Sequence, residues 1–350
     1  MVALLVSCTV SIPSKDVEIP FQYEGKRSGT FAWSYRAGDY VRGTPAVSDG
    51  IVYVGADDNT LHALDANTGD SIWRYETADN VTSPPVVFED AMVIFGSWDG
   101  AVYALDAAQG EVRWQHQTDG WVTASPVISD STVYVGSHDG FLYALAAERG
   151  DLVWRYETDG LIEGGACLVN DLAVFGSTDN YVYALDSGSG DLRWRYRTDG
   201  DIVSTPAVGA GTAYVGSTDR KLYALDVSTG RLLWTFEAGY GIEASPIVID
   251  GTVYVGANDG RVYALQALDG RLVWQYQARD IVRSSPTAYG DLLFVGSDGG
   301  CIYGLDRETG EPVWSYRTAG AIAAGPAIAD GMLFVGSTDR HVYAFNVTVE

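Results

Sequence analysis

The stretch "VGSTDRKLYALDVSTGRLLW", from Val215 to Trp234, recurs with small changes along the chain. Forty residues earlier the sequence reads "FGSTDNYVYALDSGSGDLRW", and forty residues later it reads "VGANDGRVYALQALDGRLVW". A fixed period near 40 residues is typical of repeat architectures. The tryptophan that ends each copy is found at Trp33, Trp73, Trp114, Trp154, Trp194, Trp234, Trp274 and Trp314.

One period contains four short β-strands. From Ser245 to Ala278, the sequence "SPIVIDGTVYVGANDGRVYALQALDGRLVWQYQA" alternates apolar and polar residues in four runs, which Asp-Gly and related turns separate. β-Branched residues and tyrosine dominate these runs, and no helical periodicity is visible. Four-stranded antiparallel units that repeat radially predict an all-β protein of the β-propeller type.

The two ends of the chain carry complementary parts of one unit. The segment "GTFAWSYRAG", from Gly29 to Gly38, provides a tryptophan strand before any complete unit, whereas the last unit ends at "HVYAFNVTVE" without one. We therefore predict an eight-bladed β-propeller of four-stranded antiparallel blades over residues 29–350, with the last blade closed by the N-terminal strand. Such closure leaves neither terminal strand unpaired.

The residues that recur in every unit are expected to be structural. Each tryptophan of the series should pack its indole between neighbouring blades. The Asp and Gly of segments such as Asp226 to Gly230 suit a turn in which the carboxylate accepts backbone N–H bonds and glycine takes a positive φ.

These segments carry a resemblance to a known family. "HALDANTGDSIW", from His62 to Trp73, resembles the tryptophan-docking motif of the quinoprotein, or PQQ-like, eight-bladed propellers, and the resemblance extends from about Gly29 to Val349. Quinoprotein dehydrogenases of this family carry long insertions, a disulfide between adjacent cysteines beside the quinone, and a calcium site. This chain has uniform units and no adjacent cysteine pair. It looks more like the BamB-type lipoproteins of the cell envelope, which are scaffolds that bind partner proteins through loops on one face.

The resemblance implies a non-enzymatic, monomeric scaffold that engages a protein partner through one loop face and needs no cofactor. One alternative is a PQQ-dependent dehydrogenase or quinone-binding protein, which would hold PQQ with calcium. A second alternative is the sensor domain of a signalling system.

The charge of the chain excludes some partners. It has 22 basic and 46 acidic residues, for a formal net charge of −24 at pH 7, and its only lysines are Lys15, Lys26 and Lys221. Such a surface repels phosphate backbones, so we expect no binding to nucleic acid. Acid-rich, lysine-poor surfaces are typical of proteins from salt-loving microbes, where concentrated ions screen the self-repulsion. No apolar run is long enough to span a membrane as a helix.

The first 28 residues are predicted to be a lipoprotein signal remnant and a tether. "LVSC", from Leu5 to Cys8, resembles a lipobox, and a lipid on Cys8 would anchor the propeller on the outer face of a membrane without spanning it. The preceding "MVALLV" lacks the positive and apolar regions of a signal peptide, so a cytoplasmic location is the alternative. Cys167 and Cys301 fall in different blades, too far apart to form a disulfide.

Functional differences between the blades are expected in two loops that open on one face. The loop into the first strand aligns Tyr40, Asn80, Trp121, Leu161, Asp201, Gly241, Ile281 and Ala321. Two residues further on, and predicted to ring the mouth of the central channel, are Arg42, Thr82, Thr123, Glu163, Val203, Glu243, Arg283 and Ala323. The loop between the second and third strands offers Asp57, Trp98, His138, Thr178, Thr218, Asn258, Asp298 and Thr338.

An aromatic patch is the best candidate for a partner or ligand site. Trp98 and Trp121 lie outside the structural tryptophan series and fall on the same face of blades 2 and 3, with His138 and Tyr40 expected nearby. Tryptophan and tyrosine are favoured anchors at interfaces. The alternative interpretation is that these rings only cover the edges of the loops.

The charged residues of the predicted ring also have two interpretations. Arg42, Glu163, Glu243 and Arg283 are expected to pair across blades, Glu243 with Arg283 for instance; alternatively, they orient a charged small molecule. In blade 4, "EGGAC" replaces the usual Ser-Pro, and we expect a looser blade there. No catalytic or metal site is predicted, since the four histidines are scattered without metal-ligand spacing.

Overall fold

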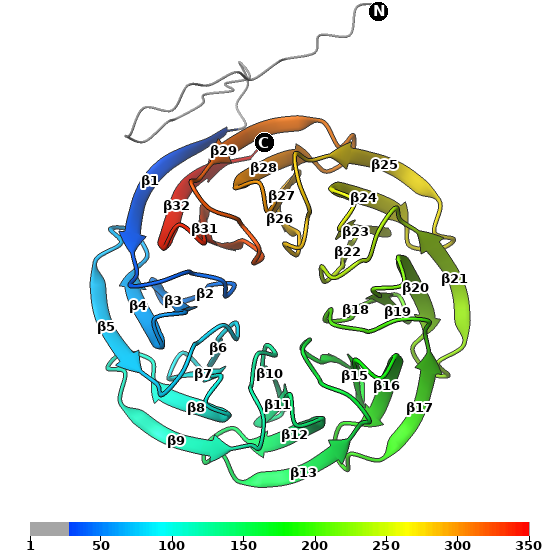
Figure 1. Cartoon of the computed structure of the whole chain (residues 1–350), viewed down its shortest axis with the longest axis horizontal. Coiled ribbons are helices and arrows are strands. Elements are labelled where there is room, and N and C mark those ends of the chain that lie inside the picture. Colours follow the sequence, from blue (N-terminus) through cyan, green and yellow to red (C-terminus); the bar gives the residue numbers. More distant parts are fainter. Residues whose placement is uncertain (1–27, 350) are drawn as a thin grey trace, which may run out of the picture.

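The computed structural model describes residues 28–349, which form thirty-two β-strands and no helix. The strands assemble into eight four-stranded antiparallel sheets, arranged as blades around one axis (Figure 1). The all-β, eight-bladed propeller that the repeat predicts is therefore confirmed. Because the described residues contain no helix, none of them forms a helix that could cross a membrane.

The strands of each blade are numbered along the chain. Blade 1 consists of β2 (Ala46–Ser48), β3 (Ile51–Ala56), β4 (Thr60–Asp65) and β5 (Ser71–Glu76). Blade 2 consists of β6 (Val86–Phe88), β7 (Met92–Gly96), β8 (Ala101–Asp106) and β9 (Val112–Gln117). Blade 3 consists of β10 (Val127–Ser129), β11 (Thr132–Gly136), β12 (Phe141–Ala146) and β13 (Leu152–Glu157). Blade 4 consists of β14 (Cys167–Val169), β15 (Leu172–Gly176), β16 (Tyr181–Asp186) and β17 (Leu192–Arg197).

The second half of the ring continues in the same order. Blade 5 consists of β18 (Ala207–Gly209), β19 (Thr212–Gly216), β20 (Lys221–Asp226) and β21 (Leu232–Glu237). Blade 6 consists of β22 (Ile247–Ile249), β23 (Thr252–Gly256), β24 (Arg261–Gln266) and β25 (Leu272–Gln277). Blade 7 consists of β26 (Thr287–Tyr289), β27 (Leu292–Gly296), β28 (Cys301–Asp306) and β29 (Pro312–Arg317). Blade 8 consists of β30 (Ala327–Ala329), β31 (Met332–Gly336), β32 (His341–Thr348) and β1 (Ser28–Arg36).

Burial explains the sequence pattern of each blade. The first strand lies nearest the axis and the fourth forms the outer wall (Figure 1). The two middle strands, such as β19 and β20, are buried almost throughout because neighbouring blades cover both of their faces. The outer strand β21 alternates exposed and half-buried residues, as expected where one face meets water.

Seven of the eight structural tryptophans dock on a turn of the next blade. The indole Nε1–H of Trp194 in β17 donates to the carbonyl of Val227 at 2.8 Å. The same turn holds Gly230 at a φ of +69°, where an added Cβ would lie 2.6 Å from the Trp194 ring. Asp226 shapes this turn by accepting the backbone N–H groups of Ser228 and Thr229. The expected roles of the tryptophan, aspartate and glycine are therefore confirmed at this joint.

The same indole hydrogen bond recurs at seven joints of the ring. The donors are Trp33, Trp73, Trp114, Trp154, Trp194, Trp234 and Trp274.

A second contact closes each joint at the opposite end of the blade. Ile242 donates its backbone N–H to the carbonyl of Ser217 in the preceding blade at 2.9 Å. Gly216 permits this approach, since a Cβ there would lie 2.6 Å from the Ile242 side chain. The equivalent N–H donors at all eight joints are Val41, Val81, Val122, Ile162, Ile202, Ile242, Val282 and Ile322.

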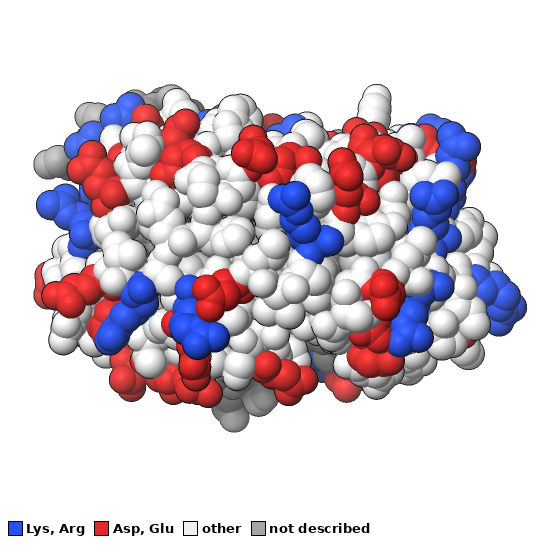
Figure 2. Space-filling model, turned by 90° about the horizontal axis from the view of Figure 1, so that it is seen from below, with Lys and Arg blue, Asp and Glu red and all other residues white. Residues whose placement is uncertain are grey.

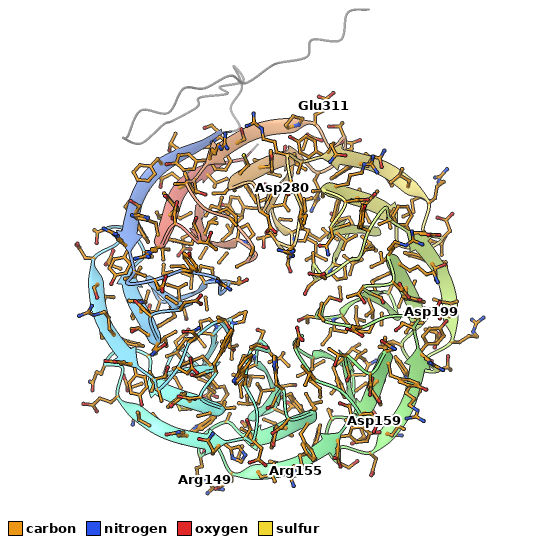
Figure 3. All side chains as sticks on the ribbon, viewed as in Figure 1. Arg149, Arg155, Asp159, Asp199, Asp280 and Glu311 are labelled. Carbon is orange, nitrogen blue, oxygen red and sulfur yellow. The ribbon has the colours of Figure 1, made fainter. Side chains whose placement is uncertain are left out.

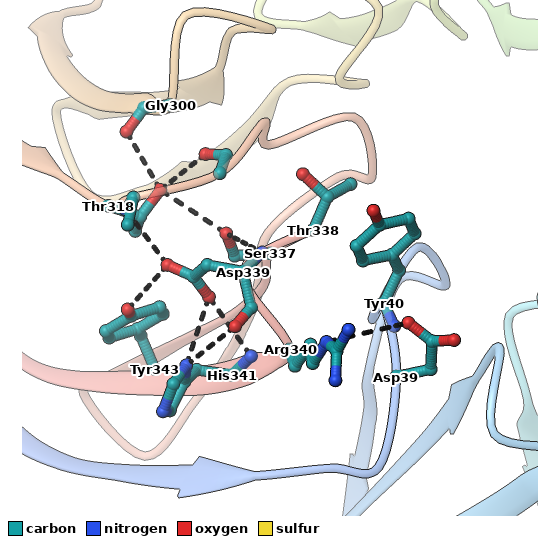
Figure 4. Close-up of polar contacts among 12 residues, drawn as sticks. Asp39, Tyr40, Gly300, Thr318, Ser337, Thr338, Asp339, Arg340, His341 and Tyr343 are labelled. Carbon is teal, nitrogen blue, oxygen red and sulfur yellow. Dashed lines mark hydrogen bonds and ion pairs between the residues drawn. The ribbon is translucent and has the colours of Figure 1, made fainter.

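The N-terminal strand closes the ring as predicted. β1 pairs antiparallel with β32, from Ser28 opposite Thr348 to Arg36 opposite His341. Asp39 and Arg340 then form an ion pair of 3.7 Å that joins the two ends of the described chain (Figure 4). The joint between blades 7 and 8 differs from the others, because Trp314 packs against Gly29 of β1 and not against a turn.

The cysteines within the described range are separate. Cys167 is in β14 and Cys301 is in β28, and both are free thiols, as predicted. The predicted tether and the predicted lipidation site at Cys8 lie outside the described residues.

Replacing Trp194 by alanine is expected to lower the free energy of unfolding by about 3 to 5 kcal/mol, because it empties the joint between blades 4 and 5. Urea denaturation followed by circular dichroism measures this change. Trp98→Ala serves as the control, since Trp98 is outside the joint series, and a similar loss in both variants would contradict the assigned role of Trp194.

Gly29→Ala is expected to destabilise the closure by about 1 to 3 kcal/mol, because the new Cβ would lie 2.6 Å from the Trp314 ring. Thr30→Ala, at the exposed neighbouring position, should be close to neutral. The melting temperatures of the two variants provide the comparison, and equal values would show that Trp314 is not held against β1.

Candidate functional site

The two variable loops open on one face, which we call the loop face. In each blade, the second loop donates a backbone hydrogen bond to the first; the N–H of His138, for example, bonds to the carbonyl of Trp121 at 2.8 Å. The eight donors are Asp57, Trp98, His138, Thr178, Thr218, Asn258, Asp298 and Thr338. Their acceptors are the eight first-loop residues aligned from the sequence, so that alignment is confirmed in every blade.

Side chains two residues beyond these acceptors occupy what we call the inner position. In several blades they bond to the second loop of their own blade. The Trp98 Nε1–H donates to Thr82 Oγ1 at 2.8 Å, and a hydrogen bond of 2.9 Å links Thr123 Oγ1 with His138 Nε2. These bonds fix the orientation of the Trp98 and His138 rings.

The structure brings three of the predicted site residues into one aromatic cluster, formed by Trp98, Trp121 and His138. The two indoles stack with their centroids 4.4 Å apart and an interplanar angle of 12°. The His138 ring lies 5.6 Å from the Trp121 ring. Trp121 keeps 47% of its surface exposed. A rigid, partly exposed aromatic surface therefore bridges blades 2 and 3.

Tyr40 does not join this cluster. The guanidinium of Arg42 lies over its ring, 5.2 Å from the centroid. Among residues 28–349, no ring contact connects Tyr40 with Trp98 or Trp121. Tyr40 is instead in contact with a cation of its own blade.

The imidazole of His138 is kept neutral by its surroundings. Burial lowers its pKa below the usual 6.5, while the nearby carboxylates of Glu163 and Asp139 partly oppose this change. At pH 7 the aromatic cluster therefore carries no charge of its own.

Three of the predicted charged residues are paired. Arg283 makes an ion pair of 3.3 Å with Glu243 of the preceding blade, and a second ion pair with Asp298 of its own blade. Arg42 bonds to Asp57 at 3.0 Å. The Glu243 and Arg283 pairing expected from the sequence is present.

Burial makes two of the three acidic partners, Asp57 and Asp298, weaker acids than usual. It raises the pKa of Asp57 and of Asp298, whereas the adjacent guanidinium groups act in the opposite direction. Each also keeps one buried carboxylate oxygen, Oδ1, that bonds to no residue within 28–349.

Glu163 differs from the other charged residues at the inner position. It is half-buried, and it makes no hydrogen bond or ion pair with any residue between 28 and 349. Its negative charge acts on His138, whose pKa it raises. The structure thus leaves one carboxylate without a counter-ion beside the aromatic cluster.

The expectation of a looser blade 4 is wrong. A Cβ on Gly164 would lie 2.6 Å from the carbonyl oxygen of Ser204, so the two backbones are in close contact. The N–H of Gly165 also donates to Thr205 Oγ1 of blade 5 at 2.8 Å. Glycine at these positions permits closer packing of blades 4 and 5.

The bond from Gly165 to Thr205 belongs to a series of backbone hydrogen bonds to Ser and Thr hydroxyl groups of the next blade. This series was not predicted from the sequence. Thr205 donates its N–H to Ser245 Oγ at 2.9 Å, and Ser245 donates its N–H to Ser285 Oγ at 3.0 Å. Gly325 donates to Thr44 Oγ1 across the closure. The recurring Ser-Pro and Thr-Pro pairs were the available signal.

No metal-binding cluster forms within residues 28–349. No group of three or more His, Cys, Asp or Glu side chains in this range is arranged to hold a metal ion. Burial raises the pKa of the Cys167 thiol, which makes it a poor nucleophile. Cys167 and Cys301, the cysteines of this range, are not adjacent, so they do not fit the paired-cysteine arrangement expected of the quinoprotein dehydrogenases.

Carboxylates dominate the surroundings of the site. Viewed from the edge, acidic side chains gather along both rims of the disc (Figure 2). Asp159 and Asp199, which lie in equivalent loops one blade apart, occupy equivalent places in successive sectors of the ring (Figure 3).

Comparison with protein families gives one match over nearly the whole chain. The matching family is described as outer membrane protein assembly factor BamB. The matched residues are 25–196, 178–289 and 279–349.

Several solved structures share the fold. BamB from Moraxella catarrhalis is 22% identical, with a TM-score of 0.80 over 91% of this chain and 99% of that chain. The computationally designed Ika8 protein is 20% identical, with a TM-score of 0.82 over 91% of this chain and 100% of that chain. At these identities the likeness shows the fold alone.

One curated protein matches a short stretch of sequence. The quinohemoprotein alcohol dehydrogenase of Comamonas testosteroni is 47% identical over 47 residues, which are 13% of this chain and 7% of that enzyme. The match covers little more than one repeat unit.

The pKa of His138 is expected to fall further in the Glu163→Gln variant, because that carboxylate raises it in the native protein. NMR titration of the histidine ring signals measures the pKa directly. Asp151→Asn, on an exposed turn between β12 and β13, should leave it unchanged. An unaltered His138 pKa in Glu163→Gln would contradict the close placement of the two groups.

Proposed function

The chain belongs to the family described as outer membrane protein assembly factor BamB, and from this premise we propose that it is a non-enzymatic scaffold that binds a protein partner through its loop face. The observation that carries the proposal is the stacked pair of Trp98 and Trp121, which is partly exposed and outside the structural tryptophan series. Tryptophans of this kind are common anchors of protein interfaces.

The cluster is suited to binding because it is already ordered. The bond from Trp98 to Thr82 and the bond between His138 and Thr123 hold two of its three rings in place. A partner therefore pays little conformational entropy to order these side chains on contact.

The family also supports a location. Its name refers to the outer membrane, and we propose that this chain acts as a monomer in the cell envelope, held by a lipid on Cys8. Cytoplasmic location remains the alternative that fractionation of the native cells would reveal. The acidic surface suits a protein that works at high salt, where ions screen its net charge of −24.

A quinone-dependent dehydrogenase is the second candidate, favoured by the 47-residue match to the Comamonas enzyme. Titration with PQQ and calcium, combined with a dye-linked activity assay, separates the two functions. Saturable binding with turnover would support the enzyme, and absence of both would support the scaffold.

The variant that carries Trp98→Ala and Trp121→Ala is expected to recover its partner from a native envelope extract at least about tenfold less well than the native protein. One central tryptophan typically contributes about 2 kcal/mol or more to an interface. Quantitative mass spectrometry of the captured proteins measures the difference.

Tyr240→Ala is the matched control, because Tyr240 is 67% exposed on a first loop of the same face but lies in blade 6. Equal recovery by the double tryptophan variant and the native protein would remove the aromatic cluster from the interface.

A further inference from the structure

Two glutamates of the inner position offer a comparison inside one molecule. Glu163 and Glu243 occupy the same place in blades 4 and 6. Glu243 is bonded twice: Arg283 of the next blade lies 3.3 Å from its carboxylate, and Asn258 donates to it at 2.6 Å. Glu163 has neither bond within residues 28–349. Blade 6 therefore shows how a glutamate at this position is neutralised and hydrogen-bonded.

Glu163 lacks the neighbouring cation that Glu243 has. In blade 5, the residue equivalent to Arg283 is Val203, whose side chain is short, apolar and half-buried. The guanidinium that neutralises Glu243 therefore has no counterpart next to Glu163. Neutral His138 does not replace it, because burial keeps its pKa low.

The surrounding loops offer Glu163 no unpaired cation, because Arg220 and Lys221 of blade 5 are already paired with Glu237 and Asp199. The first and second loops of blades 2 to 4 contain no lysine or arginine. These loops cover residues 77–85, 97–100, 118–126, 137–140, 158–166 and 177–180. Their acidic residues are Asp79, Asp99, Asp119, Asp139, Asp159, Glu163 and Asp179. This sector of the loop face is therefore negative around a neutral aromatic centre.

Resting on the proposed function, we propose that the partner inserts an arginine side chain next to Glu163. Its guanidinium occupies the space above Val203, as Arg283 does beside Glu243, and pairs with the Glu163 carboxylate. Neighbouring apolar residues of the same partner segment pack on Trp121. The ligand class is thus an arginine-containing, partly apolar protein segment.

Arginine fits this sector better than lysine. A planar guanidinium pairs with a carboxylate through two parallel bonds and also stacks on aromatic rings. The chain already uses such stacking on its outer wall, where Arg155 lies 4.4 Å from the Phe141 centroid and Arg195 lies 4.8 Å from the Tyr181 centroid.

The test uses a fluorescent peptide that alternates arginine, glycine and leucine, together with a copy in which citrulline replaces arginine. Citrulline keeps the shape and removes the charge. Fluorescence anisotropy at about 0.15 M salt, where the screening length is about 8 Å, reports binding to the full chain. We expect the arginine peptide to bind at least about tenfold more tightly than the citrulline peptide.

Three variants locate the binding. Glu163→Gln should weaken the binding of the arginine peptide at least about fivefold. Asp280→Asn removes one charge from the same face in blade 7, on the far side of the ring from Asp159 (Figure 3), and should not weaken it. Val203→Arg supplies the cation from the chain itself and should abolish the preference for arginine, while the melting temperature shows that the variant is folded.

The outcomes are distinct. Equal binding of the two peptides, equal effects of Glu163→Gln and Asp280→Asn, or unchanged binding by Val203→Arg would each overturn the arginine site. If Val203→Arg and Glu163→Gln still capture the partner while the double tryptophan variant does not, the arginine site falls and the proposed function stands. If the double tryptophan variant captures the partner normally, the proposed function itself falls.

Discussion

Close contact between neighbouring blades is the constraint on which the rest of the structure depends. Glycine makes it possible at both ends of the joint: Gly230 receives the indole of Trp194, and Gly216 admits Ile242. A side chain at either glycine would push the sheets apart, and the indole and backbone hydrogen bonds would lengthen together. Because each joint also sets the angle of the next blade, the closure at β1 and β32 requires all of the joints to be regular. The repeated sequence is the consequence of this requirement.

The same constraint decides where variation is allowed. Asp219, for example, accepts the Tyr223 hydroxyl and the N–H of Asp199, so it holds one blade to the next and has little freedom to change. The inner position and the start of the second loop carry no such bond to a neighbouring blade in most copies. They meet mainly their own blade, as Thr82 meets Trp98. Function can diverge there without disturbing the ring, and most of the candidate residues of the loop face lie in these places, with Tyr40 and Trp121 two residues before the inner position.

Sequence reasoning could predict the ring because period, strand pattern and the unmatched strand at each end are all local features. It could align the loops for the same reason. It could not predict that Gly216 admits the next blade, since a glycine inside a strand is also compatible with a bulge or a bend. The contact of Arg42 with the Tyr40 ring could not be predicted either, because it depends on the rotamer of Arg42. The contact of Trp314 with Gly29 also escaped prediction. The third and fourth strands of blade 8 come from opposite ends of the chain, so no turn joins them on which Trp314 could dock.

Charge distribution connects the fold with selectivity. In blades 6, 7 and 1 the inner position contains charges of both signs, which largely neutralise one another, as Arg283 does between Glu243 and Asp298. In blades 2 to 4 the same face has carboxylates without basic residues in its loops. A chain with a net charge of −24 attracts any cation weakly and without direction. A lone carboxylate beside a fixed aromatic surface localises that attraction, because one segment of the partner must supply both the positive charge and the apolar contact.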